Sequence, residues 1–126
     1  MTYQLTFDDA AEVAILSYSE PTDISEQIES RCKIISLCQE QNCKKALILL
    51  GDVLAHQSFS KAELKLYGES IDKEMANEIT FAVVMPDSIE SQNEMYFPIH
   101  IMKQNGILMK TFYTKDDALS WLTRLD

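Results

Sequence analysis

Four side chains with acid–base or nucleophilic chemistry lie close together in one short stretch of the chain. Asp52, His56, Ser58 and Ser60 supply a carboxylate, an imidazole and two hydroxyls, which are the groups of an orienting acid, a base and a nucleophile. A serine hydrolase would also hold its serine on a strained turn within a GxSxG motif. A phosphate-binding loop would require GxxxxGK[ST]. The chain contains neither motif around these residues, so we predict a non-enzymatic protein and keep a hydrolase built on this loop as an alternative.

The two serines are expected to have different roles. Ser60 stands three residues before Glu63 in a capping-box pattern, so its hydroxyl is predicted to cap a helix. Ser58 lies just before that helix start, where a phosphate would meet free backbone N–H groups and a favourable dipole. Phosphorylation would add about two negative charges there and could switch a partner surface, so Ser58 is a candidate phospho-acceptor. The candidate partner-binding loop around it consists of Asp52, His56, Gln57 and Ser60.

A second candidate site is the apolar stretch "MYFPIHIM" around Pro98. It contains more large apolar side chains than one helix stripe can bury, and most of them are expected in the core. A helix kinked or broken at the proline could instead place Tyr96, Phe97 and Ile101 along a small apolar pocket or a dimer seam. The protein would then be a carrier for a small molecule or lipid. His100, in the same helix, is expected to be packed rather than catalytic.

The three cysteines, Cys32, Cys38 and Cys43, are an odd number at spacings that match no zinc or redox pattern. Cys32 and Cys38 fall near the apolar face of a predicted helix, where reduced cysteine behaves as a small hydrophobe. We therefore expect buried free thiols. Because the chain has only two histidines, a multi-histidine metal site is not expected, and no cofactor is implied.

Length and charge exclude several classes of protein. The 126 residues fit one domain, residues 1–126, with 46% hydrophobic and 25% charged residues. A net charge of −9 disfavours nucleic acid and anionic membranes as partners. No apolar run approaches the ~18 residues of a membrane span, and the N-terminus lacks the pattern of a secretion signal. We expect a cytoplasmic protein whose partner is another protein, with a homodimer left open.

The elements that would position these residues alternate along the chain. Period-2 alternation over residues 3–7, followed by the run 13–18, predicts a β-hairpin. The runs 46–50 and 79–85 are almost wholly apolar, which is typical of parallel strands buried on both faces. The segment 107–113 is predicted as the last strand.

Capping patterns predict where the helices begin. The paired residues are Asp23 with Glu26, Ser60 with Glu63, Asp87 with Glu90, and Thr114 with Asp117. The first helix is expected to run to about Gln41. Its apolar face is predicted to contain Ile24, Ile28, Ile35 and Cys38.

The resulting order is ββαβαβαβα, which predicts an α/β domain with a mostly parallel sheet of about five strands covered by helices. The runs 46–50 and 79–85 should lie side by side at its centre. Ligands of such sheets bind beyond the carboxyl ends of the strands. The loop over residues 51–59 is much the longest at that edge, where two to six residues are usual.

This order, with its strand–loop–helix around the long loop, resembles the STAS family of SpoIIAA-like anti-sigma factor antagonists. The last third is similar to the small bacterial STAS/SEC14-like proteins in "FAVVM", "MYFPIHIMKQNG", "MKTFYT" and "DDALSWL". The resemblance implies a SpoIIAA-like fold, a regulatory or protein-interaction role, and phosphorylation in a D-S-S-G-like turn before the second helix. Ser58 matches the acceptor position, while Gln57 replaces the aspartate and Ser60 the glycine.

Overall fold

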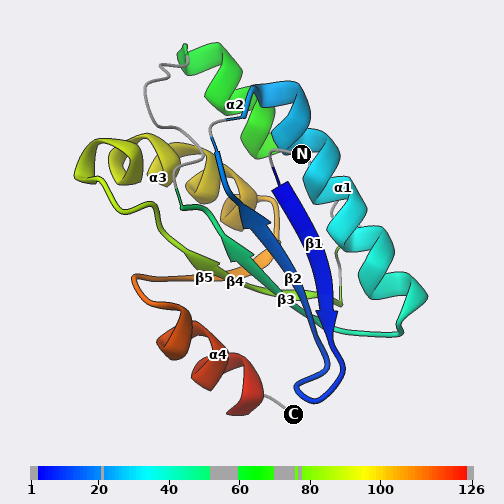
Figure 1. Cartoon of the computed structure of the whole chain (residues 1–126). Coiled ribbons are helices and arrows are strands. Elements are labelled where there is room, and N and C mark those ends of the chain that lie inside the picture. Colours follow the sequence, from blue (N-terminus) through cyan, green and yellow to red (C-terminus); the bar gives the residue numbers. More distant parts are fainter. Residues whose placement is uncertain (1–2, 21, 52–59, 70–75, 77, 125–126) are drawn as a thin grey trace.

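The structure is a computed structural model that describes residues 3–20, 22–51, 60–69, 76 and 78–124 (Figure 1). The elements follow in the predicted order ββαβαβαβα. They are β1 (Tyr3–Asp8), β2 (Val13–Tyr18), α1 (Ile24–Glu40), β3 (Lys45–Leu49), α2 (Lys61–Glu69), β4 (Thr80–Val84), α3 (Ile89–Gln104), β5 (Leu108–Phe112) and α4 (Lys115–Arg124).

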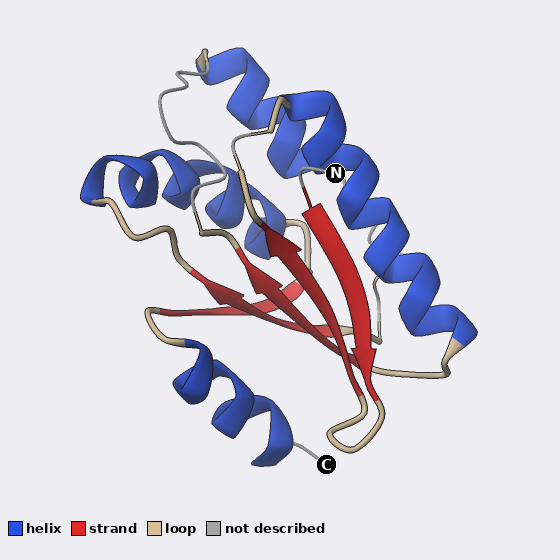
Figure 2. Ribbon diagram, viewed as in Figure 1, coloured by secondary structure: helices blue, strands red, loops and turns tan. Residues whose placement is uncertain are grey.

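The strands form one five-stranded sheet in the sequential order β1-β2-β3-β4-β5. The β1–β2 pair is antiparallel and the other neighbours are parallel, so the mostly parallel sheet is confirmed. Each new strand is added on the same side, and crossovers of one hand then carry α1, α2 and α3 to the same face. Figure 2 shows these three helices on one side of the sheet and α4 alone on the other.

The central strands are buried on both faces, as their apolar runs predict. Along β3, Leu47 belongs to the core layer under α4 and Ile48 to the layer under α1 and α3, because successive side chains of a strand alternate between faces. β3 and β4 pair in parallel, with Ala46 opposite Phe81. The predicted neighbourhood of these two strands at the centre of the sheet is confirmed.

Helix caps agree with the sequence at three starts and differ at one. The Asp23 side chain accepts a hydrogen bond from the N–H of Glu26 at 2.8 Å, and Thr114 Oγ1 accepts one from the N–H of Asp117 at 3.2 Å. At the third, Ser60 Oγ accepts from the N–H of Glu63. The prediction of Asp87 as a cap was wrong: Ser88 is the N-cap of α3 and accepts from the N–H of Ser91. Adjacent Asp and Ser are both good caps, and the helical backbone begins one residue later than the pattern suggested.

Helix α3 continues through Pro98 without a break. Met95, Ile99 and Met102 are all buried and share one face at spacings of four and three residues. Packing of this stripe supports the helix across the residue that lacks a backbone N–H. The predicted alternative of two separate helices is therefore wrong.

Helix α1 buries a single regular stripe. Its buried residues are Gln27, Ser30, Arg31, Ile34, Ile35 and Cys38, which follow the i, i+3, i+4 spacing of one helix face. Of the predicted apolar face, Ile35 and Cys38 are buried and Ile28 is only half-buried. Cys32 is exposed, so the prediction that it is buried was wrong. Each residue of an α-helix is rotated by about 100° from the one before it. Cys32 directly follows the buried Arg31, so its side chain is turned away from the sheet.

Candidate functional site

The loop predicted to carry the site lies largely outside the described residues. This applies to Asp52, His56, Gln57 and Ser58. Ser60 is described and exposed. Its Oγ accepts a hydrogen bond from the N–H of Glu63 at 3.1 Å, and its own N–H donates to Glu63 Oε1 at 3.0 Å. The predicted capping box is confirmed, and α2 begins at Lys61, directly after Ser60.

The first residue of that loop packs against the end of β2. Gly51 has φ +51°, and a Cβ built on it would lie 3.0 Å from the backbone oxygen of Tyr18. Both the left-handed backbone and this close approach require glycine. Tyr18, at the carboxyl end of β2, therefore lies directly beside the place where the predicted loop begins.

Tyr18 belongs to a chain of buried polar side chains at the same edge. Its hydroxyl is hydrogen-bonded to Ser30 Oγ, and Ser30 Oγ donates to the backbone oxygen of Gln27 at 2.9 Å. The side-chain Nε2 of Gln27 donates to the backbone oxygen of Thr22 at 3.1 Å. We call Tyr18, Thr22, Gln27, Ser30 and Arg31 the polar cluster.

Arg31 is the charged member of the polar cluster and is 2% exposed. One of its guanidinium nitrogens, Nη1, lies 3.6 Å from the Met102 sulfur, Sδ, on α3. Burial lowers the pKa of Arg31, although the neighbouring Tyr18 opposes this shift. Burial raises the pKa of Tyr18 above its usual 10.0, while the Arg31 charge lowers it. The phenol is therefore neutral at pH 7 and able to donate a hydrogen bond.

Thr22 Oγ1 and Gln27 Oε1, both in the cluster, are buried without a hydrogen-bond partner among the described residues. An unsatisfied buried polar atom costs about 1–3 kcal/mol. Folded proteins accept such a cost mainly where the atoms serve something other than packing.

The chemistry of the polar cluster is that of binding rather than proton transfer. General acid–base catalysis needs a group whose pKa lies near the working pH. Burial raises the pKa of Tyr18 further above neutrality, and an arginine guanidinium keeps its proton in proteins. What the cluster offers is a hydroxyl, an amide oxygen and a buried positive charge beside the long loop.

The sequence did contain a signal for this cluster, which the search for apolar residues missed. Ile28 and Ile35 are two helical turns apart, and Arg31 falls between them on the same face. A charged residue at such a position must either be exposed or be buried in a polar setting. The structure shows the second outcome.

The predicted apolar pocket near Pro98 stays a prediction. Tyr96 is 43% exposed, and Phe97 and Ile101 are half-buried. Hollows of about 530 Å³ beside Tyr3 and about 580 Å³ beside Asn42 lie elsewhere and are not lined by these three residues. His100 is exposed, so its predicted packing was wrong; it lies about 100° around the helix from buried Ile99.

Cys38 is not suited to act as a reactive thiol. Cys38 and Cys43 are buried. Burial, helped by the neighbouring Cys43 thiol, raises the pKa of Cys38 to about 12. A thiol with such a pKa is a poor nucleophile at neutral pH. Within the described residues, no group of three or more metal-ligating His, Cys, Asp or Glu side chains is present.

Comparisons with known proteins were negative: no family model, no curated protein and no solved structure matches the chain. The resemblance to the STAS family therefore stays a prediction. In the part of the chain that the structure describes, no helix has the length and apolar character needed to cross a membrane.

Proposed function

We propose that this protein is a cytoplasmic, non-enzymatic regulatory module of STAS type, which binds a protein partner through the carboxyl edge of its sheet around residues 51–68. The observation that supports this most directly is the reciprocal capping box of Ser60 and Glu63. Ser60 and Glu63 are both exposed at the start of α2, and Ser58 stands two residues before Ser60 in the sequence.

The polar cluster gives the proposal its second support. It lies under the same edge, and burial raises the pKa of its phenol, Tyr18, further above neutrality. A hydrolase would need a group that changes protonation near neutral pH. Binding through a surface that this cluster helps to hold in place fits the chemistry better than catalysis does.

The test is capture of a partner with the full chain in two forms, wild type and Ser58→Glu. The partner identified with one form is then purified, and its Kd is measured against both. We expect at least about a tenfold difference, because a negative charge placed beside a helix start alters both the local field and the partner surface.

Ser36→Glu provides the matched control, since Ser36 is exposed on the outer side of α1. Ser36→Glu should leave the Kd within about twofold of the wild-type value, because the added charge lies away from the proposed partner surface. Failure to capture a partner with either form contradicts the proposal. So does an equal change for Ser58→Glu and Ser36→Glu.

A further inference from the structure

The two edges of the sheet differ in what surrounds them. β1 and β5 are the outer strands, and an outer strand presents unpaired backbone N–H and C=O groups. Among the described residues, three large apolar side chains exposed to solvent flank β5: Tyr96 at 43%, Leu108 at 54% and Tyr113 at 65%. No such side chain of the described part of the chain belongs to β1.

These side chains flank the β5 edge on both faces of the sheet. Met109 packs in the core layer under α3, and Phe112 in the layer under α4. By alternation, Tyr113 points to the α3 side and Leu108 to the α4 side. The Tyr113 hydroxyl lies 2.8 Å from the hydroxyl of Tyr96 on α3. An extended chain added to β5 would therefore meet an aromatic pair on one side and a leucine on the other.

A strand added to the β5 edge could come from a second copy of this chain or from a different protein. The charges near β5 distinguish between these two possibilities. Lys110 is the middle residue of β5, with its ammonium 5.5 Å from the Phe112 ring centroid and 5.6 Å from that of Trp121. Antiparallel pairing of β5 with itself over its full length would set Lys110 against Lys110, and like charges directly opposite are destabilising. Two chains of net charge −9 also repel each other.

The negative charges near the end of β5 and over the whole chain favour a basic partner. Asp116 and Asp117 are exposed in the first turn of α4, just beyond the carboxyl end of β5. A positively charged residue at the matching end of an added strand would be attracted to them, and the net charge of the chain acts in the same direction.

We propose that the free edge of β5 binds an extended, net-basic segment of a partner protein as a sixth, antiparallel strand. Backbone hydrogen bonds to β5 supply affinity, and the segment's alternating side chains gain specificity from the Tyr96–Tyr113 pair and from Leu108. The inference rests on the proposed function, because it assumes that the protein has a protein partner. It assigns that partner a surface separate from the Ser58 loop.

The experiment selects binders from a phage-displayed library of random ten-residue peptides, with the full chain as the target. Selected peptides are synthesised and their Kd values are measured by calorimetry against wild type, Leu108→Ser, Tyr113→Ser and Leu66→Ser. Leu66 lies on α2 and is 58% exposed, so Leu66→Ser removes the same side chain at a matched exposure. All three changes are at the surface and should leave folding intact, which circular dichroism checks.

We expect net-basic peptides with alternating apolar residues, weakened at least about tenfold by Leu108→Ser and by Tyr113→Ser and less than about twofold by Leu66→Ser. Hydrogen exchange of the β5 backbone amides should slow when peptide is bound.

The inference is overturned if no peptide is selected, if Leu66→Ser weakens binding as much as Leu108→Ser, or if the slowed amides lie outside β5. A wild-type dimer in sedimentation that Leu108→Ser dissociates would also overturn it, because the occupant would then be a second copy. Failure here leaves the Ser58-dependent partner experiment untouched. Conversely, peptide binding at β5 without a Ser58-dependent partner would remove the loop from the proposed function.

Discussion

The two halves of α1 bury equal lengths of the same helix face, but one half buries polar side chains and the other buries apolar ones. The first half buries Gln27, Ser30 and Arg31, and the second half buries Ile34, Ile35 and Cys38, with none of the six more than 2% exposed. Depth and helical phase are therefore matched, and only the identity of the side chains differs.

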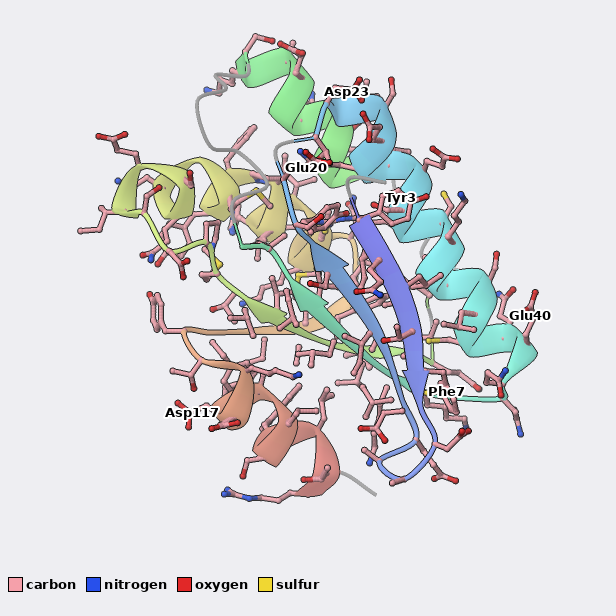
Figure 3. The ribbon with its side chains drawn as sticks, viewed as in Figure 1. Tyr3, Phe7, Glu20, Asp23, Glu40 and Asp117 are labelled. Atoms are coloured by element: carbon pink, nitrogen blue, oxygen red, sulfur yellow. The ribbon has the colours of Figure 1, made fainter. Side chains whose placement is uncertain are left out.

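The difference follows the direction of the sheet. Figure 3 shows Asp23, at the start of α1, near the end of the sheet where Tyr3 lies, and Glu40, at its end, near Phe7. Since β1 is antiparallel to β2, the Tyr3 end is the carboxyl edge of the parallel strands. The apolar half of α1 thus covers the amino edge, and the polar half covers the edge where parallel sheets place their sites. We infer that the amino edge is scaffold and that, in α1, the cost of burying polar groups is accepted in the half that covers the carboxyl edge.

Truncation in the apolar half tests the scaffold side of this comparison. Ile34→Ala should lower the free energy of unfolding by about 2–5 kcal/mol, because it removes buried methyl groups and leaves a cavity. Ile28→Ala, on the same helix but half-buried, should cost clearly less. Urea unfolding of the three proteins measures both values. If Ile34→Ala and Ile28→Ala lowered the free energy of unfolding by the same amount, the apolar half of α1 would not be the more tightly packed one.

The same contrast shows which features the sequence could and could not predict. The element order, the parallel pairing of β3 with β4 and the Ser60 capping box were predictable, because each depends on local spacing or on a long apolar run. The burial of Arg31 could have been predicted from its place on the helix face, but the Tyr18–Ser30 hydrogen bond could not, because only the packing of α1 on β2 joins these residues. The side chains of Cys32 and His100 were misplaced for a related reason, since a shift of one residue rotates a side chain by about 100°.

Cys38, the last residue of the buried stripe, makes the apolar half sensitive to alkaline pH. Its thiol has an ordinary pKa of 9.0 in an unfolded chain and a pKa of about 12 when folded. The unfolded state therefore releases its proton first, so this stabilisation is complete below pH 9 and is lost as the pH rises toward 12. Cys38→Ala should lower stability at pH 7 but flatten its decline above pH 9.

The exposed Cys32 supplies the control for this measurement. Thermal melts from pH 7 to pH 11 should show the same alkaline decline for Cys32→Ala as for wild type. A Cys38→Ala variant with the wild-type slope would show that the folded thiol is not protected by burial.

In the polar cluster, which adjoins the polar half of α1, one substitution should stabilise the protein. Thr22 is 1% exposed, and its Oγ1 has no hydrogen-bond partner among the described residues. Thr22→Val keeps the shape and the backbone oxygen that accepts from Gln27, while it removes the buried hydroxyl. We expect a gain of about 1 kcal/mol in chemical unfolding.

Thr6→Val on the exposed side of β1 is the matched change, and it should stay within about 0.5 kcal/mol of wild type. If Thr22→Val instead lowers stability, the hydroxyl has a partner in the folded protein. The polar half would then be a satisfied structural network, and the contrast between the halves of α1 would no longer indicate a site.

The smallest effect is expected where α1 ends at the amino edge. Asn42 adopts φ +53°, and the next N–H, from Cys43, donates to the backbone oxygen of Cys38 at 2.7 Å. This is the helix-ending motif that glycine usually forms, with asparagine as the second choice. Asn42→Gly should therefore keep or raise stability by a few tenths of a kcal/mol, whereas Asn42→Ala should lower it by about 1 kcal/mol. Gln41, whose φ is −89°, is the control position. There alanine should be better tolerated than glycine, the reverse of the ranking at Asn42.

Urea unfolding of the four variants measures both rankings. The same ranking of glycine and alanine at both positions would show that the left-handed residue does not end the helix. If the order does reverse, this end of α1 is fixed by backbone geometry alone, as expected of scaffold.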